Sequence, residues 1–286
     1  MILKNKYKIY IKKILGKGGF GCVYKGKNLE NKQKIAIKCD EKIKYNKKEF
    51  KIYKLLNEHF NTFDFIDYYE TKDKSYLFLP LFNKNCDSLL KKYSFTIKDI
   101  CMLTIQILQQ IHNLHKVNII HCDIKPDNLL WDINTNKFKL IDFGLSKVFI
   151  KDTKHVEKIK SQSRCGTLRY MSINSHEKFT LSRKDDLISL CYTIIYLNRS
   201  NLPWKGIKNK YSSKKKIYLK IRNLKKLFNK NLDDYEIPEP LIFLLKYSNN
   251  LKFNQKPNYL YLIKVFYLYL KKNDFKYDGK WSWIKK

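Results

Sequence analysis

The densest run of chemically useful side chains is HCDIKPDN, residues 121–128. Its aspartate, Asp123, could accept the proton of a hydroxyl group, and Asn128 could bind a magnesium ion through its amide oxygen. A second carboxylate, Asp142, opens the segment DFG after the apolar pair LI and could chelate magnesium that bridges phosphates. Phosphoryl transfer needs little covalent help from a protein, because it depends mainly on positioning and on neutralising phosphate charge.

A lysine with the right spacing precedes this run. Lys38 ends the segment IAIK and could hold the α- and β-phosphates of a nucleotide. A lysine in this role needs a carboxylate to position it, and Glu49 is the candidate, in a helix predicted over 47–57. Glu41 and Glu58 compete for the role, although Glu41 precedes the predicted helix and Glu58 lies at its end.

A glycine-rich segment, GKGGFGCV, spans residues 16–23 and matches the pattern G-x-G-x-x-G-x-V. Glycine lets the backbone approach phosphates closely, because it has no Cβ. A dinucleotide-binding fold would place a helix after the glycines and an acidic residue about 20 positions further on. Here a strand-like VYKGK follows instead. The expected nucleotide contacts in this segment are Gly16, Lys17, Gly18, Gly19, Phe20, Gly21 and Val23.

In order and spacing these segments resemble the signature set of eukaryotic-type protein kinases, which use ATP and Mg²⁺. Lys125 lies two residues after Asp123, a position typical of serine/threonine kinases, where the lysine neutralises the γ-phosphate. Thr167, in Gly-Thr, fits the same interpretation, because its hydroxyl can bridge Lys125 and Asp123. The resemblance implies transfer of the γ-phosphoryl group of ATP to serine or threonine.

The second half of the chain narrows the resemblance. It contains GTLRYMSIN, in which SIN replaces the usual A-P-E, and further on SRKDDL, LPWKG and KPNY. With EFKIYK near the N-terminus and the stretch ending at Trp283, these strings resemble the casein kinase I family over essentially the whole chain. The related vaccinia-related kinases fit the strings less well. The resemblance implies an α+β, two-lobed fold with a β-rich N-lobe at about 1–79, a hinge at 80–84 and a larger helical C-lobe at about 85–286.

The resemblance also assigns residues around the nucleotide. Leu79 would lie behind the adenine, Pro80 would offer a backbone carbonyl, and Phe82 would donate its N–H to the adenine ring. Ala36 and Leu130 complete the expected nucleotide contacts. Asp186 resembles the helix aspartate that braces the catalytic loop.

The family prefers acidic or already phosphorylated protein substrates, which a basic cluster near the active site recognises. Residue-by-residue matching gives Arg169 and Lys215 for this anion site, with Lys214 and Lys216 as alternatives because the loop can be aligned in more than one way. Arginine suits bidentate phosphate contact, and lysine supplies a point charge. The lysine run is equally compatible with a solvated loop.

Two features depart from the family pattern. Cys122 stands where many kinases have the arginine of H-R-D, which pairs with a phosphate on the activation loop. We therefore expect activity without such phosphorylation, and a Cys122 side chain that is simply packed. The chain also ends with the kinase-like region, so we expect no autoinhibitory tail.

Periodicity predicts a β-rich part followed by a helical part. Strands are expected within 7–38, over 76–82 until Pro80 interrupts, and over 138–143. In the helix at 47–57, one face should hold Phe50, Tyr53 and Leu56. Further helices are expected at 185–197, at roughly 257–271, and along the stripe Ile100, Leu103, Ile107, Ile111 and Leu114.

The charge is strongly positive, with 59 Lys and Arg against 26 Asp and Glu, or +33. It could attract acidic protein, nucleic acid or anionic membrane, or it could reflect a composition that is also rich in Asn, Ile and Tyr. The charge is spread along the chain and no nucleic-acid-binding module occurs, so we expect no specific nucleic acid partner. The rival from another class, a pseudokinase scaffold, is disfavoured because each catalytic position holds a suitable residue type.

Cysteine content and hydropathy bear on the compartment. Seven cysteines, an odd number without a CxxC pair, indicate reduced thiols and argue against a disulfide framework or a zinc site. No apolar run approaches the roughly 20 residues of a membrane-spanning helix, and the N-terminus lacks the apolar stretch of a signal peptide. We expect a monomer inside the cell, in the cytoplasm, the nucleus or both, without membrane association.

Overall fold

The computed structural model describes residues 1–17, 21–60, 65–210 and 213–284. The chain divides into two compact units. The first consists of residues 1–83 together with 142–144, and the second of residues 84–141 together with 145–286. The short segment 142–144 thus belongs to the first unit although it follows much of the second in sequence.

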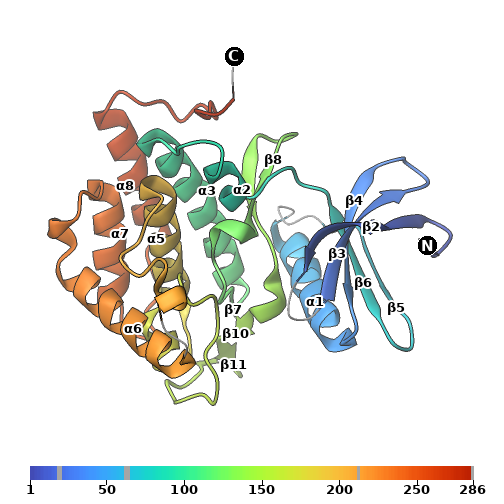
Figure 1. Ribbon diagram of the computed structural model, residues 1–286, viewed down its shortest axis with the longest axis horizontal. Helices are drawn as coiled ribbons and strands as arrows, with labels where there is room; N and C mark the ends of the chain where they lie inside the picture. Colours follow the sequence, from blue (N-terminus) through green and yellow to red (C-terminus); the bar gives the residue numbers. More distant parts are fainter. Residues whose placement is uncertain (18–20, 61–64, 211–212, 285–286) are drawn as a thin grey trace. The chain divides into compact units, whose positions relative to one another are not determined.

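The first unit is an antiparallel sheet with strand order β1-β2-β3-β4-β6-β5 among its described residues, and α1 packs against β4 and β6 (Figure 1). Its core consists of alternate residues of β2, β4 and β6, as expected for a sheet with one buried face. The elements are β1 (Ile2–Leu3), β2 (Tyr7–Lys17), β3 (Gly21–Asn28), β4 (Lys34–Asp40), α1 (Ile43–Phe60), β5 (Asp67–Glu70) and β6 (Ser75–Pro80).

Helix α1 is longer than the predicted span 47–57, and its buried face is rotated from the predicted one. Tyr53 and Leu56 are buried as expected. The other predicted member, Phe50, lies at the edge of that face, half-buried, with its ring stacked on Tyr68 at 4.8 Å. The buried face instead includes Glu49, which is unusual for a glutamate and signals a specific partner.

The second unit is mainly helical. Its strands are short: β7 (Ile119–Ile120) pairs with β10 (Lys147–Val148), β8 (Leu129–Asp132) with β9 (Lys137–Leu140), and β11 (Ile150–Lys151) with β12 (Lys154–His155). Its helices are α2 (Cys86–Leu90), α3 (Ile97–Lys116), α4 (Ile173–His176), α5 (Arg183–Arg199), α6 (Lys214–Lys230), α7 (Glu239–Asn250) and α8 (Tyr259–Lys272).

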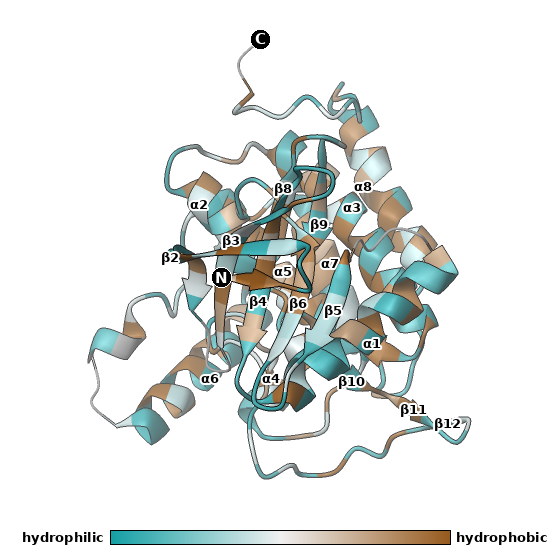
Figure 2. Ribbon diagram, turned by 90° about the vertical axis from the view of Figure 1, so that its right-hand side faces the viewer, coloured by the Kyte–Doolittle hydropathy of each residue, from teal (hydrophilic) through white to brown (hydrophobic). Residues whose placement is uncertain are grey.

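Helices α3 and α5 form the centre of the second unit, and α7 and α8 pack on them. The predicted stripe of α3 is confirmed, since all five of its residues are fully buried. The helix begins at Thr96, whose hydroxyl accepts the Asp99 N–H while the Asp99 carboxylate accepts the Thr96 N–H. By contrast, α6 carries both hydrophobic and hydrophilic residues along its length, as expected for a helix with one solvated side (Figure 2).

Of two predicted strands, one ends where it was expected to end and the other stops early. β6 ends at Pro80, as predicted from the missing N–H. The predicted strand 138–143 stops at Leu140, because the backbone leaves the extended region at Asp142, where φ is +67°. No helix within the described ranges is both long and apolar enough to cross a membrane.

Candidate active site

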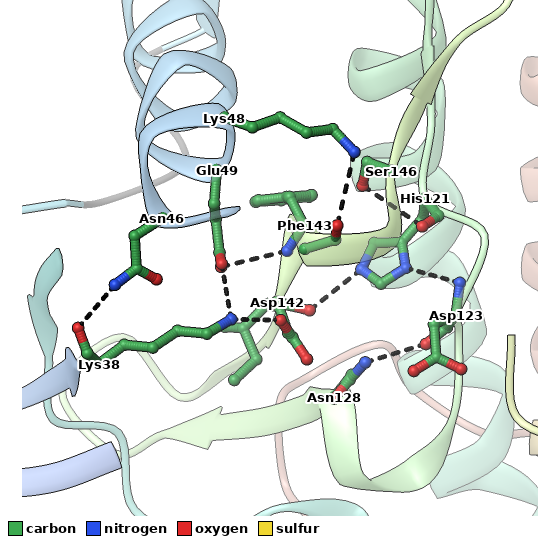
Figure 3. Close-up of polar contacts among 12 residues, drawn as sticks. Lys38, Asn46, Lys48, Glu49, His121, Asp123, Asn128, Asp142, Phe143 and Ser146 are labelled. Carbon is green, nitrogen blue, oxygen red and sulfur yellow. Dashed lines mark hydrogen bonds and ion pairs between the residues drawn. The ribbon is translucent and has the colours of Figure 1, made fainter. Parts of the chain in front are cut away.

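The ammonium group of Lys38 lies between two carboxylates of the first unit. Its Nζ is 2.6 Å from Oε2 of Glu49 and 2.6 Å from Oδ1 of Asp142 (Figure 3). The other carboxylate oxygen of Glu49 accepts the backbone N–H of Phe143 at 3.2 Å. Glu49 thus binds the lysine and also holds the segment that carries Asp142.

The position of each glutamate on or beside α1 decides which one meets the β4 lysine. Glu49 is 1% exposed on the buried face of α1. The Glu41 side chain is 81% exposed and 4.0 Å from Lys74, and Glu58 pairs with Lys54 on the helix surface. The two competing glutamates therefore have other, exposed partners.

The sheet register brings the glycine-rich segment next to Lys38. On β3, Val23 is the Cα partner of Gly16 in β2 and of Lys38 in β4. Gly21 has no room for a side chain, because a Cβ there would lie 2.0 Å from the carbonyl oxygen of Cys39. Of the other predicted contacts, Lys17 ends β2, and Gly18, Gly19 and Phe20 lie outside the described residues.

Two further features fix the lysine and its partners. The Asn46 side chain donates to the carbonyl oxygens of Lys38, at 3.0 Å, and Ser75, at 3.1 Å, which ties α1 to β4 and β6. A Cβ at Gly144 would lie only 3.3 Å from Oδ1 of Asp142 and 3.7 Å from the Lys38 Nζ. A side chain at Gly144 would therefore crowd the lysine.

The charges keep Lys38 protonated. Burial disfavours its ammonium form, but the carboxylates of Glu49 and Asp142 outweigh burial and raise the pKa of Lys38. Burial also raises the pKa of Glu49, against the opposing effect of Lys38. A positively charged group held in this way is suited to bind phosphate oxygens.

In the second unit, Asp123 is held by Lys125 and Thr167. The Lys125 Nζ donates to Oδ2 of Asp123 at 2.6 Å and to the Thr167 hydroxyl at 3.3 Å. Thr167 donates to Oδ1 of Asp123 twice, from its backbone N–H at 2.8 Å and from its hydroxyl at 2.7 Å. The predicted bridge between lysine and aspartate through Thr167 is therefore present, and the Asp123 side chain is fixed in one orientation.

The loop 121–128, here called the catalytic loop, is closed by its own side chains (Figure 3). The Asn128 amide nitrogen donates to the Asp123 carbonyl at 2.9 Å, which leaves its Oδ1 as the atom suited to a metal ion. His121 accepts the Asp123 N–H through Nδ1 at 3.2 Å and donates from Nε2 to the Ile141 carbonyl at 3.0 Å. This pattern assigns the neutral Nε2–H tautomer to His121.

A buried aspartate supports the catalytic loop from α5. Asp186 accepts the backbone N–H groups of His121, at 2.7 Å, and Cys122, at 2.8 Å. It also accepts from Nε2 of His115 at 2.9 Å, and Nδ1 of His115 accepts the Tyr259 hydroxyl. Burial lowers the pKa of His115, which keeps it neutral in this chain of contacts. The bracing geometry is the one that the resemblance implied for Asp186.

One functional aspartate, and the residue before the other, have left-handed backbones. Cys122, which precedes Asp123, has φ +68°, and Asp142 has φ +67°. Non-glycine residues adopt such angles at a cost of about 1–3 kcal/mol. The hydrogen bond from the Cys122 N–H to Asp186 and the ion pair of Asp142 with Lys38 offset that cost locally.

Four of the residues expected around adenine belong to the first unit and one belongs to the second. In the first unit, Ala36 of β4 and Leu79 of β6 are direct Cα partners, and Pro80 pairs with Ile35. Phe82 follows β6 and is half-buried. In the second unit, Leu130 of β8 is half-buried and forms a bridge with Asn85.

The expected anion-binding residues lie on different elements of the second unit. The Arg169 guanidinium lies 5.1 Å from the Tyr196 ring and 5.8 Å from the Tyr170 ring. No carboxylate among the described residues forms an ion pair with it. Lys215 is exposed in the first turn of α6, and no contact joins it to Arg169 in the described part of the chain. The Lys205 Nζ lies 5.6 Å from the same Tyr196 ring.

The strings SIN and SRKDD are joined in space. Ser172 donates its hydroxyl proton to Oδ1 of Asp185 at 2.6 Å, and the Asn174 amide donates to the same oxygen at 3.1 Å. The other oxygen accepts the Ser182 N–H at 2.7 Å. These contacts tie the segment after Thr167 to the beginning of α5.

Sequence reasoning missed Lys225, which is fully buried on α6. Its Nζ donates to the carbonyl oxygens of Leu168 and Met171. In the same segment, Trp204 donates from Nε1 to the Arg169 carbonyl oxygen at 2.8 Å. Burial lowers the pKa of Lys225. One signal was available: Lys225 continues the apolar face of α6 that Ile217 and Ile221 begin.

The combination of a strand lysine paired with a helix glutamate, an Asp-Phe-Gly segment and a loop carrying Asp123 and Asn128 defines a protein kinase. Residues 9–264 match the family described as protein kinase domain. The chain is also 31% identical over 284 residues to the probable casein kinase I homolog of Encephalitozoon cuniculi (strain GB-M1), an alignment that covers 94% of this chain and 91% of that protein. The chain therefore belongs to the casein kinase I family of protein kinases, with the predicted α+β kinase fold.

Proposed function

We propose that this kinase transfers the γ-phosphoryl group of ATP to serine or threonine hydroxyls of protein substrates. The observation that carries the proposal is the contact set of Asp123, Lys125 and Thr167. Asp123 is positioned to accept the proton of the attacking hydroxyl, and Lys125 to neutralise charge on the transferring group. Lysine at this position is typical of kinases that act on serine and threonine.

The residues present fit Mg²⁺ and ATP. Asp142 offers a carboxylate in the first unit, and Asn128 an amide oxygen in the second, which are the ligand types that magnesium prefers. No cluster of three or more His, Cys, Asp or Glu suited to a metal occurs among the described residues. When bound, magnesium would neutralise negative charge that develops on the phosphates. Lys38, positioned by Glu49, would bind the α- and β-phosphates.

We propose further that the substrates are acidic or already phosphorylated. Arg169 supports this, because its guanidinium rests on tyrosine rings and pairs with no described carboxylate. Three consecutive lysines occupy the first turn of α6, where the helix dipole disfavours positive charge. An anion bound near Lys215 would relieve that repulsion. The net charge of +33 would speed encounter with acidic proteins.

Labelled ATP, magnesium and an acidic phosphoprotein test the proposal. The purified chain should transfer label to serine or threonine, and Asp142→Ala should abolish transfer. Asp73→Ala, which changes an exposed carboxylate in the first unit, is the matched control and should keep wild-type activity. Absence of transfer by the unaltered chain would favour a scaffold role, and label on tyrosine alone would contradict the serine/threonine assignment.

A further inference from the structure

We propose that Cys122 and Cys165 form a reversible disulfide when the kinase meets a hydroperoxide, and that this bond links the catalytic loop to the segment before Thr167. The proposal concerns a covalent modification site and goes beyond the transfer reaction. Both cysteines belong to the second unit.

The backbones that carry the two cysteines run next to each other. A Cβ at Gly166 would lie 2.6 Å from the Cys122 carbonyl oxygen, so the two backbone segments are in contact there. One residue further on, the Thr167 N–H donates to Asp123 at 2.8 Å. Cys165 and Cys122 are therefore flanking residues of a close contact between two segments.

The side chains of the two cysteines also share one small apolar cluster. Cys122 is 4% exposed in a small apolar cluster with Ile120, Phe149 and Leu181, and Cys165 packs against that cluster. The Cys122 Sγ lies 3.8 Å from the Ile120 carbonyl oxygen, and each thiol is near enough to the other to shift its pKa. Both cysteines are free thiols in this structure, so the pair is in its reduced form.

The environment favours Cys165 as the attacking thiol. The neighbouring Cys122 thiol lowers the pKa of Cys165 to about 7, against the effect of burial, and the Lys147 ammonium acts in the same direction. Cys165 is also half-exposed, whereas Cys122 is buried and has a raised pKa. Thiolates, not thiols, react with peroxides.

Four of the other five thiols are less suited to react. Burial raises the pKa of three of them and encloses them in the core: Cys86, Cys101 and Cys191. Burial also raises the pKa of Cys39, which is the Cα partner of Cys22 across β3 and β4. That second pair provides a built-in comparison within the first unit.

The chemistry balances with a hydroperoxide as the oxidant. The Cys165 thiolate attacks one peroxide oxygen, the O–O bond breaks, and the other oxygen leaves as water or an alcohol after taking up a proton. Cys165 is then a sulfenic acid. The Cys122 sulfur attacks that sulfur, the S–O bond breaks, and water leaves with the Cys122 proton. Two thiols have lost two electrons and two protons to one peroxide, and a dithiol reductant reverses the change.

The bond would disturb the site through Asp123 and Thr167. A disulfide holds its sulfur atoms about 2.05 Å apart, far closer than two thiols that are not bonded to each other. Drawing them together must shift the backbone of one or both segments. Displacements of about 1 Å at catalytic groups can cost about 100-fold in rate. We expect oxidation to lower activity at least about tenfold and reduction to restore it.

The test uses the full chain, reduced and then treated with a small molar excess of hydrogen peroxide. Peptide mapping by mass spectrometry should find Cys122 linked to Cys165, with the loss of two hydrogens, and this readout does not depend on kinase activity. The Cys165→Ser variant should keep basal activity and resist peroxide. Cys39→Ser, the matched control, should form the same disulfide as the wild type.

Three results would overturn the proposal: a disulfide that maps to Cys22 and Cys39 instead, thiols that remain reduced, or a Cys165→Ser variant as sensitive to peroxide as the wild type. Cys122→Ser removes a buried group and could misfold, so Cys165→Ser decides the question by itself. If the chain showed no kinase activity, the mapped disulfide would still test this proposal.

Discussion

The Lys38 ammonium and the Glu49 carboxylate are 2.6 Å apart, and they come from a strand and a helix that are adjacent in sequence. The Glu49 side chain is 1% exposed. Lys38 pairs with Glu49 and Asp142, so removal of the Glu49 charge leaves it with Asp142 alone. The pair therefore fixes where the lysine points, and it depends on α1 lying against β4.

Glu49→Gln keeps the size of the side chain and removes the charge that orients Lys38. Loss of one partner from a buried ion pair is costly, so we expect kcat/KM for ATP to fall at least about tenfold. Glu58→Gln, which alters an exposed glutamate at the end of the same helix, should stay close to wild type. Steady-state kinetics with varied ATP measures both, and equal values for the two variants would exclude the assigned role of Glu49.

Thr167→Val removes a hydroxyl that donates to Asp123 and accepts from Lys125, but keeps the backbone N–H bond to Asp123. Hydrogen bonds to charged groups contribute about 1.5–3 kcal/mol, so kcat should fall about tenfold or more. Thr167→Ser retains the hydroxyl and should restore most of the activity. A Thr167→Ser variant as slow as Thr167→Val would argue that the methyl group, not the hydroxyl, matters.

Local periodicity predicted the elements of this fold well. The α3 stripe follows directly from helical spacing, and β6 ends where Pro80 removes a hydrogen-bond donor. The partner of Lys38 was harder to predict, because three glutamates lie in or near one helix and only its orientation against β4 selects Glu49. Spacing along a sequence does not specify how a helix is rotated against its sheet. The prediction that Phe50 lies on the buried face was inaccurate for the same reason.

The features that sequence did not predict all depend on contacts between distant segments. Lys225 was hidden by a chain rich in exposed lysine, although it is fully buried and holds two carbonyl oxygens of the segment 168–171. Cys122 is packed, as expected, but the packing of Cys165 against the same cluster was not predicted, because it arises only when that segment folds against the catalytic loop. Asp186, by contrast, was predicted, but from the resemblance to the family and not from the spacing of residues.

His176 makes stability depend on pH. It is 3% exposed, and burial, aided by the nearby charges of Lys225, Arg164 and Arg222, lowers its pKa from 6.5 to about 2. Below the unfolded pKa, the unfolded chain binds a proton that the folded chain does not, so stability is full above about pH 6.5 and falls as the pH falls.

The variant His176→Phe keeps an aromatic ring and cannot be protonated. Between about pH 7 and about pH 5, it should lose about 2 kcal/mol of the wild-type change in the free energy of unfolding. Urea denaturation at the two pH values measures the change. His59→Phe, at an exposed position, should retain the wild-type difference. An unchanged pH dependence in His176→Phe would contradict the burial argument.

Arg169→Ala tests the choice of substrate. If Arg169 binds a substrate phosphate, kcat/KM should fall about tenfold for a phosphorylated peptide and much less for its unphosphorylated counterpart. Arg222→Ala, which changes an arginine on α6 near Glu177, is the comparison and should affect the two peptides equally. Equal loss on both peptides in Arg169→Ala would remove Arg169 from substrate selection.

The central claim is that Asp123 accepts the proton of a substrate hydroxyl during phosphoryl transfer. Single-turnover transfer from labelled ATP to a serine peptide, at saturating magnesium and enzyme, measures that step directly. The Asp123→Asn variant should bind ATP as the wild type does and transfer at least about 100-fold more slowly. Transfer at the wild-type rate by Asp123→Asn would contradict the account.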